Sequence, residues 1–319
     1  MSAQEARIGV VGATGAVGTV TLRLLRERGY RHVRAFASAR SAGRRLDGGL
    51  AVEEATPAAL AAGELDLVLF SCGTNASREL VPSAVEGGAL AVDKSSAYRL
   101  TDGYPLVVPE VNGERALDAL ETTRVVANPN CSTIPLACVL KPLHDAAGLR
   151  AVRVSTYQAV SGAGAQRMER LRAEPPERHD LGFDWPWEDD ETEEEAKIRA
   201  ETRKILDLPC LPVSATTVRV PVLVGHAESV WVETEEPLEP ERAAKLLAAA
   251  PGVRLVEAPT PRAAAETEDV LVGRIRPDRA AGRHGLVLFL ACDNLVKGAA
   301  LNAIQIAELL LEPARTSAR

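Results

Sequence analysis

One cysteine lies where an apolar, helix-like segment begins. Residues 128–133 read Asn-Pro-Asn-Cys-Ser-Thr, and apolar side chains then recur at helical spacing as far as Gly148. The free N–H groups and the dipole of a helix N-terminus stabilise negative charge, so they favour the nucleophilic thiolate there. Cys131 is therefore a candidate nucleophile. The alternative is that it is a small buried side chain.

A glycine-rich turn follows the first apolar strand, residues 7–11. Gly12, Gly15 and Gly18 are spaced G-x-x-G-x-x-G, and a helix is expected from about 17 to 28. Gly12 permits a tight turn, Gly15 lets backbone N–H groups approach a pyrophosphate, and Gly18 allows the helix to pack on the strand. A strand, this turn and a helix together predict a dinucleotide-binding site.

The end of the second strand, residues 33–38, indicates which dinucleotide binds. An acidic residue there would contact the adenine ribose of NAD, but the chain has Arg40, Ser41 and Arg44 instead. A guanidinium fork and hydroxyls suit a 2′-phosphate, which favours NADP. The alternative is that the arginines are solvated loop charges.

Further apolar strands are expected at 65–70 and 89–93, alternating with helical stretches such as 77–86. This alternation predicts an α/β fold with a Rossmann-type, doubly wound parallel sheet. Ligands bind at the carboxyl ends of such strands, so the loops after residues 70 and 93 are expected beside the cofactor.

Composition excludes several classes of function. The net charge of -7 over 319 residues argues against nucleic acid as a partner. No segment approaches the roughly 20 apolar residues of a membrane span and no signal peptide is evident, so we expect a cytoplasmic protein. The five cysteines are odd in number and lack metal-ligand spacing, so neither disulfides nor a metal site is expected. All except Cys131 are expected to be packing residues.

The order and spacing of several short segments resemble the aspartate-semialdehyde dehydrogenase family over nearly the whole chain. The segments that carry the resemblance are 12–18, 38–43, 107–112, 128–133, 157–164, 219–222, 293–295 and 297–302. The resemblance implies NADPH-dependent reductive dephosphorylation of L-aspartyl-4-phosphate through a Cys131 thioester, in lysine, threonine and methionine biosynthesis. It also implies an α+β catalytic and dimerisation domain after the Rossmann domain.

The resemblance also assigns roles to individual residues. Cys131 is the nucleophile, His226 the acid/base, and Gln158 holds the acyl intermediate. The substrate-binding residues implied are Arg99 and Lys197 for phosphate, Arg219 for the α-carboxylate, Glu194 for the amine, and Asn130 with Gln158. The cofactor-binding residues implied are Gly12, Thr14, Gly15, Ala16, Val17, Arg40, Ser41, Ser161, Gly162 and Asn294.

Spacing constrains two of these groups. Arg219 and His226 are an odd number of residues apart, so the strand alternation must break between them, and Gly225 and Pro221 are the candidate places for the bend. A helix over 192–206 would place Glu194 and Lys197 on one face. Because residues 188–195 are so acidic, a solvated helix face is the alternative for Glu194.

The resemblance implies a discontinuous domain order. Residues 1–130 would bind NADP, 131–296 would form the catalytic and dimerisation domain, and the C-terminal helix within 297–319 would return to the first domain. A homodimer or homotetramer is expected. Residues 165–196 are shorter than in relatives and diverge, and Trp185 and Trp187 could cover a partner surface or cap a local core.

The sequence leaves three rival functions. An N-acetyl-gamma-glutamyl-phosphate reductase shares the chemistry, but usually has Gly before its cysteine and an aromatic residue after it, where this chain has Asn130 and Ser132. A noncatalytic relative would not be expected to keep the candidate site residues. A paralogue that serves a specialised pathway is the third alternative.

Overall fold

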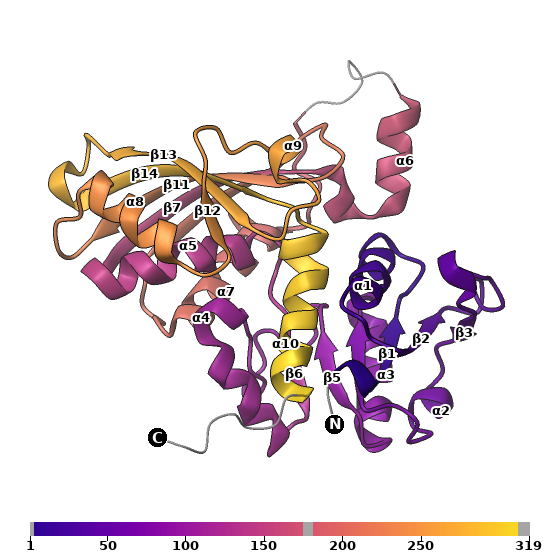
Figure 1. Ribbon diagram of the computed structural model, residues 1–319. Helices are drawn as coiled ribbons and strands as arrows, with labels where there is room; N and C mark the ends of the chain where they lie inside the picture. Colours follow the sequence, from indigo (N-terminus) through magenta and orange to yellow (C-terminus); the bar gives the residue numbers. More distant parts are fainter. Residues whose placement is uncertain (1–2, 175–180, 312–319) are drawn as a thin grey trace. The chain divides into compact units, whose positions relative to one another are not determined.

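The computed structural model describes residues 3–174 and 181–311 (Figure 1). These residues divide into two compact units. The first contains residues 3–129 and 299–311, and the second contains 130–174 and 181–298. The chain therefore leaves the first unit just before Cys131 and returns to it near the end.

The first unit contains a six-stranded parallel sheet with the order β3-β2-β1-β4-β5-β6. Its strands are β1 Arg7–Val11, β2 His32–Ala37, β3 Val52–Glu54, β4 Leu67–Phe70, β5 Leu90–Asp93 and β6 Val125–Ala127. Every residue of β4, β5 and β6 is buried, as expected for parallel strands covered on both faces. This strand order is that of a dinucleotide-binding fold, so the predicted fold class is confirmed.

The helices of the first unit connect these strands. They are η1 Ala3–Glu5, α1 Ala16–Glu27, η2 Asp47–Gly49, α2 Pro57–Leu60, α3 Thr74–Glu86, α4 Pro109–Asn112, η3 Gly113–Leu120 and α10 Asn302–Leu311. The amide of Asn302 at the start of α10 donates to Asn128 Oδ1 at 2.8 Å and to Val107 O at 3.1 Å. These buried bonds attach the end of the chain to the loop that precedes the second unit.

The second unit contains a six-stranded mixed sheet with the order β10-β7-β11-β14-β13-β12. Its strands are β7 Leu149–Gln158, β10 Val213–Arg219, β11 His226–Thr234, β12 Val253–Leu255, β13 Val270–Pro277 and β14 Gly285–Cys292. β7 is parallel to β10 and antiparallel to β11. Consequently the last residues of β7 and β10 and the first residues of β11 lie at one edge of the sheet.

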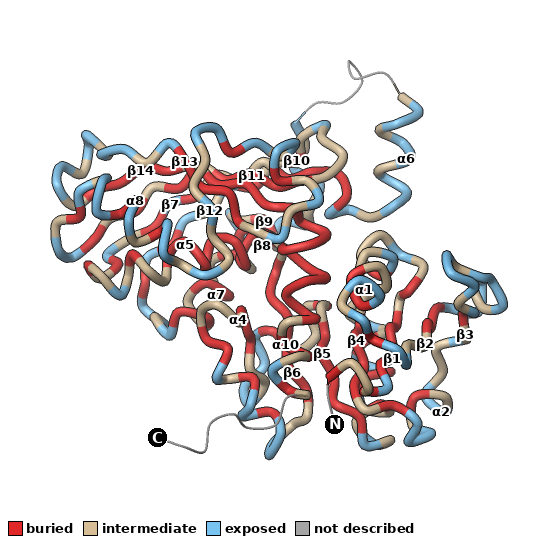
Figure 2. Tube along the Cα trace, viewed as in Figure 1, coloured by how far each residue is buried: buried red, intermediate tan, exposed pale blue. Residues whose placement is uncertain are grey.

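The helices of the second unit are α5 Thr133–Ala147, η4 Val160–Ala163, α6 Ala165–Ala173, α7 Glu193–Leu206, α8 Pro240–Ala249, α9 Pro261–Ala264 and η6 Gly282–His284. A ribbon of β8 Trp187–Glu188 and β9 Glu191–Thr192 precedes α7. The central strands of the sheet are buried, whereas α6 is largely exposed (Figure 2).

A capping box begins α7. The Thr192 hydroxyl accepts from Glu195 N, and the Glu195 carboxylate accepts from Thr192 N. This arrangement confirms the predicted helix over 192–206 and fixes which of its residues face the sheet. Near the chain's end, a π-helical stretch, η7 Val296–Leu301, precedes α10, which lies within the segment 297–319 that was predicted to contain the C-terminal helix.

Among the described helices, none combines the length and the apolar character that crossing a membrane requires.

Candidate active site

Cys131 lies in the turn that starts α5. Ile134 N donates to Asn130 O at 3.1 Å, so helical hydrogen bonding begins before the first residue of α5, Thr133. Ser132 is the N-cap, and its side chain makes no capping bond. In the same turn, Ser132 N donates to Asn130 Oδ1 at 2.8 Å, and Pro135 has no N–H. Cys131 is partly exposed between the buried Asn130 and Ser132, as a reactive thiol must be.

The Cys131 sulfur is 3.3 Å from Nε2 of His226. The other ring nitrogen of His226, Nδ1, accepts a hydrogen bond from Ala159 N at 3.0 Å. A nitrogen that accepts carries no proton, so the neutral ring holds its proton on Nε2, facing the sulfur. This tautomer makes His226 a hydrogen-bond donor to a Cys131 thiolate.

His226 is completely buried. Burial, together with the positive charge of Arg219, holds the pKa of His226 down at about 3. The imidazole is consequently neutral near pH 7, and its Nε2–H acts as a fixed dipole beside the sulfur.

The end of β10, the start of β11 and the turn between them position Arg219 and His226. Arg219 ends β10 and His226 begins β11, with a turn between them. Gly225 has a φ of +97° in that turn, and a Cβ there would lie 2.5 Å from Pro261 O. Only glycine fits such a position without strain. The predicted break in alternation at Gly225 is thus confirmed.

A network of polar side chains surrounds the Cys131 and His226 pair. Arg219 Nη1 donates to Ala159 O at 3.0 Å and to Gln158 Oε1 at 3.4 Å. Gln158 Nε2 donates to Glu194 Oε1 at 3.1 Å, and Asn130 Nδ2 donates to the same oxygen at 2.9 Å. All four polar side chains are buried. Four of the predicted substrate residues, Asn130, Gln158, Glu194 and Arg219, are therefore joined in one network.

Helix α7 also fixes the backbone next to the cysteine. Glu201, which has no exposed surface, accepts from Asn130 N at 2.7 Å. Lys197 forms an ion pair with Glu193 one turn earlier, so in this structure it does not join the network around Glu194. The helix therefore contributes two carboxylates to the cysteine loop.

Two glycines leave space around the reactive atoms. A Cβ on Gly162 would lie 3.0 Å from Arg219 Nη1 and 3.2 Å from His226 Nε2. A Cβ on Gly298 would lie 3.2 Å from the Cβ of Cys131. Both contacts are tight, so a side chain at either position would displace a site residue.

Ser161 and Asn294, which were predicted to bind cofactor, are hydrogen-bonded to each other. Asn294 Nδ2 and Ser161 Oγ are 2.9 Å apart, and Asn294 Oδ1 accepts from Gly225 N at 2.9 Å. Asn294 thus connects the loop after β14 with the segment after β7 and the turn before His226.

The residues of the glycine-rich turn belong to the first unit and fit a dinucleotide. Gly12 has a φ of +82°, and a Cβ there would lie 2.4 Å from Ser71 O. A Cβ on Gly18 would lie 2.1 Å from Gly12 O. Gly15 is the N-cap of α1 and has no side chain that could accept from the N–H groups of the first turn. These N–H groups can therefore bind a pyrophosphate.

The remaining predicted residues of the first unit lie in the turn and the helix start after β1 and on the loops after β2 and β5. Thr14, Ala16 and Val17 are partly buried in the turn and the start of α1. After β2, Arg40 is exposed and Ser41 partly buried. Arg99 is buried, and its Nη2 donates to Lys94 O at 2.6 Å.

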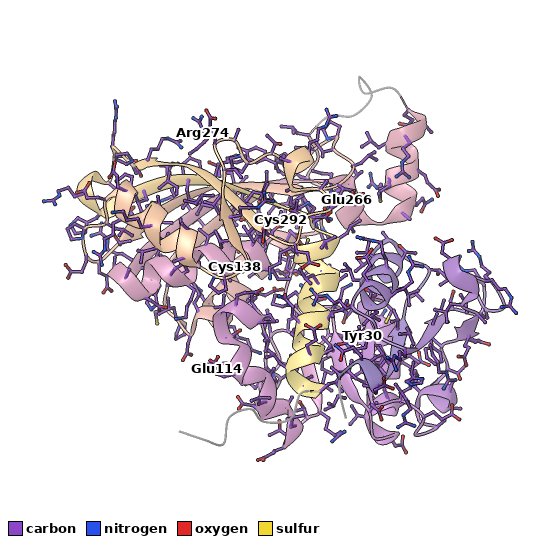
Figure 3. The ribbon with its side chains drawn as sticks, viewed as in Figure 1. Tyr30, Glu114, Cys138, Glu266, Arg274 and Cys292 are labelled. Carbon is purple, nitrogen blue, oxygen red and sulfur yellow. The ribbon has the colours of Figure 1, made fainter. Side chains whose placement is uncertain are left out.

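The other cysteines differ in their surroundings. Figure 3 labels Cys138 on α5 and Cys292 on β14, and both side chains are buried. Burial and the nearby Glu228 raise the pKa of Cys292 well above its usual value, so it stays a thiol. Cys210 is exposed, which contradicts the expectation that it is a packing residue. Within residues 3–174 and 181–311, no cluster of ligating side chains suits a metal ion.

Comparisons with known proteins identify the family. Residues 7–119 match the semialdehyde dehydrogenase NAD binding domain, and residues 140–297 match the semialdehyde dehydrogenase dimerisation domain. The aspartate-semialdehyde dehydrogenase of Streptomyces akiyoshiensis is 44% identical over 95% of this chain and 98% of its own length. The chain belongs to the aspartate-semialdehyde dehydrogenase family.

Solved structures of the aspartate-semialdehyde dehydrogenase family agree with this membership. The crystal structure of aspartate semialdehyde dehydrogenase II from Vibrio cholerae, complexed with ASA, matches with a TM-score of 0.89 and 36% identity, covering 97% of this chain and 99% of that one. The Candida albicans structure with NADP matches with a TM-score of 0.76 and 26% identity, over 96% and 98%. These findings confirm the predicted family, oxidoreductase class and nicotinamide cofactor, and favour them over the reductase alternative.

Several site features were not among the predictions. Glu201 could have been found from its spacing, because it lies two turns after Glu194 on one helix face. The Ala159 N–H carries no sequence signal, since every residue except proline has one. Gly298 lies within a segment that resembles the aspartate-semialdehyde dehydrogenase family, but no role was assigned to it.

Proposed function

We propose that the protein catalyses the reversible, NADPH-dependent reductive dephosphorylation of L-aspartyl-4-phosphate to L-aspartate 4-semialdehyde and phosphate. The observation that carries this proposal is the 3.3 Å contact between Cys131 Sγ and His226 Nε2, with Nδ1 bonded to Ala159 N. Membership of the aspartate-semialdehyde dehydrogenase family supplies the substrate class. The product aldehyde would serve lysine, threonine and methionine biosynthesis.

The chemistry begins at sulfur. The Cys131 thiolate attacks the acyl carbon of the aspartyl phosphate, and phosphate leaves with the electron pair of the broken C–O bond. NADPH, when bound, supplies the hydride that reduces the resulting thioester. The C–S bond then breaks, and the aldehyde leaves as Cys131 returns to a thiolate. His226 Nε2–H donates to the charge as it develops on sulfur or on the substrate oxygen.

The polar network accounts for substrate orientation in this proposal. Arg219 would bind the α-carboxylate through its guanidinium group, and Gln158 would hold the acyl group. Asn130 and Glu194 complete the substrate pocket, with Glu194 assigned to the amine by resemblance. Arg99 and Lys197 are assigned to the phosphate by the same resemblance.

For the cofactor, we propose that residues 1–130 bind NADP. Gly12, Thr14, Gly15, Ala16 and Val17 would hold the pyrophosphate at the N-terminus of α1. Arg40 and Ser41 would hold the 2′-phosphate, because Arg40 is exposed after β2 and no acid precedes it there. Ser161, Gly162 and Asn294 would lie at the nicotinamide.

The proposal extends to assembly and location. Residues 131–296 would form the catalytic and dimerisation domain, and 297–319 would return to the NADP-binding domain. The match to a dimerisation domain over residues 140–297 supports a homodimer or homotetramer. We place the protein in the cytoplasm, where biosynthetic NADPH is available.

The test is phosphate-dependent reduction of NADP by purified protein with L-aspartate semialdehyde, beside N-acetylglutamate semialdehyde. We expect activity with the first aldehyde alone, loss of turnover in Cys131→Ala, and unchanged NADP affinity in that variant. Cys210→Ala is the matched control, because Cys210 is exposed and lies outside the site. Activity with only the second aldehyde, or full activity in Cys131→Ala, would refute the proposal.

A further inference from the structure

A hollow of about 730 Å³ lies in the first unit, between α1 and the segment that joins β2 to β3. Figure 1 shows these elements in indigo. The hollow runs along α1 from Thr19 to Arg26 and reaches Val33, near the start of β2. The residues that we propose to hold NADP lie at the N-terminus of α1 and after the end of β2. The hollow is therefore separate from the proposed cofactor site, and its size is ordinary for the pocket of a small ligand.

The hollow lies where many parallel sheets have a crossover helix. Neighbouring parallel strands are usually joined by a helix that packs on the sheet. The connection between β2 and β3, residues 38–51, is described throughout and contains only the three-residue η2. Apolar side chains around the hollow are consequently only partly buried, and these are Val20, Leu22, Val33, Leu46 and Leu50. An apolar group placed in the hollow would cover them, which is favourable.

The lining of the hollow is positively charged, although the chain as a whole carries a net charge of -7. Four arginines line it, and these are Arg23, Arg26, Arg31 and Arg45. Among the described residues of the lining, one, Asp47, is acidic. Two of the arginines already have acidic partners, in the ion pairs Arg23–Glu27 and Arg31–Glu5. The remaining two decide which ligand the hollow suits.

Arg26 and Arg45 approach the same turn from opposite walls. Arg26 comes from α1, and its Nη1 is 3.8 Å from the position that a Cβ on Gly48 would occupy. Arg45 comes from the segment after β2, and its Nη1 donates to Gly49 O at 2.9 Å. Both residues are exposed, and within the described part of the chain neither guanidinium forms an ion pair. Two positive charges therefore lie at this turn without a carboxylate bound to them.

We propose that this hollow binds a phosphate monoester that carries an aromatic body. A phosphate monoester has a charge of about -1.5 to -2 at pH 7, which two guanidiniums balance. The guanidinium fork also matches phosphate oxygens in geometry. The aromatic body would cover the apolar side chains of α1, β2 and the segment after β2. This site goes beyond the proposed function and takes no part in the chemistry at Cys131.

The test uses 1-naphthyl phosphate as the probe, because it combines a phosphate monoester with an apolar aromatic body. We would measure its Kd by calorimetry in the presence of saturating NADP, so that the proposed cofactor site is occupied. Inorganic phosphate and 1-naphthol, titrated separately, each lack one half of the probe. The variants are Arg26→Ala and Arg45→Ala, and the matched control is Arg254→Ala. Arg254 lies on β12 in the second unit, and its side chain is half exposed.

We expect wild type to bind one 1-naphthyl phosphate per chain, and inorganic phosphate and 1-naphthol to bind at least tenfold more weakly. Arg26→Ala and Arg45→Ala should each raise the Kd of the probe about tenfold, because each removes a charge-assisted contact to phosphate. Arg254→Ala should match wild type. The thermal midpoint of Arg26→Ala should also match wild type, since within the described residues its guanidinium makes no bond.

Three results would overturn the proposal. The first is that the NADP-bound wild type shows no saturable binding of 1-naphthyl phosphate. The second is that Arg26→Ala, folded as wild type, binds the probe with unchanged Kd, which would place the probe elsewhere. The third is that inorganic phosphate or 1-naphthol binds as tightly as the whole probe, because the charged and apolar parts of the hollow would then not act together.

Discussion

His226 should remain uncharged across the whole range in which an ordinary histidine titrates. Its pKa is held at about 3 by burial and by the charge of Arg219. Lowering the pH from 7.5 to 5.0 should therefore protonate only about 1% of His226 in the folded protein. A histidine with the ordinary pKa of about 6.5 would be about 97% protonated at pH 5.0.

The lowered pKa of His226 also predicts how the stability of the fold depends on pH. The unfolded chain takes up this proton near pH 6.5, while the folded protein does not until about pH 3. Protonation therefore favours the unfolded chain as the pH falls through this window. The contribution of His226 to the free energy of unfolding should drop by about 2 kcal/mol between pH 7.5 and pH 5.0. His226→Gln, which cannot titrate, should lack this component.

The direct assay is 15N NMR of protein labelled at its five histidine imidazoles. The His226 signals are identified by their absence in His226→Gln. We expect the Nε2-protonated tautomer at pH 7.5, with no titration down to pH 5. A His226 midpoint above pH 5, or a proton on Nδ1, would refute the argument from burial and the Ala159 N–H.

Three other changes test the geometry around the site. Gly162→Ala should lower kcat/KM for the aldehyde at least tenfold without lowering the thermal midpoint, because its Cβ would press on Arg219 and His226; wild-type kinetics would show that the space is not needed. Arg40→Ala should raise the Kd of NADP about tenfold and leave the Kd of NAD unchanged. An equal loss of affinity for both would show that Arg40 does not bind the 2′-phosphate. Glu201→Ala should destabilise the fold by about 1–3 kcal/mol in denaturant, since Asn130 N loses its buried acceptor; an unchanged midpoint would mean that water replaces the carboxylate.

The sequence predicted the first unit well because its signals are local. Buried parallel strands read as continuous apolar runs, and the glycines at 12 and 18 are required by close backbone contacts. Predicted and observed helix bounds near the turn differ by one residue, 17–28 against Ala16–Glu27. The break at Gly225 was predictable for the same reason, because odd spacing and a glycine are both visible in the chain.

Contacts between distant segments could not be read from the sequence. A helix face over 192–206 was predicted to present both Glu194 and Lys197, but Lys197 pairs with Glu193, while Glu194 joins Asn130. Local spacing fixes a face, whereas the partner depends on which segment packs there. The contact of Trp185 with Arg219 is of the same kind, since it joins residues 34 positions apart in the chain.

Strand β11 carries a second buried titratable group beside the site. Glu228 lies two residues after His226 on the same strand face and is fully buried, and within the described part of the chain neither of its carboxyl oxygens has a hydrogen-bond partner. Burial raises its pKa well above the usual value, because a buried site disfavours the charged carboxylate. In the unfolded chain, Glu228 ionises as the pH rises above about 4.5, and His226 is protonated as the pH falls below about 6.5. Raising the pH therefore destabilises the fold through Glu228, and lowering the pH destabilises it through His226. Neither of the two pKa shifts stabilises the folded protein. The same burial keeps a neutral N–H donor facing Cys131, which is the form that the proposed chemistry requires.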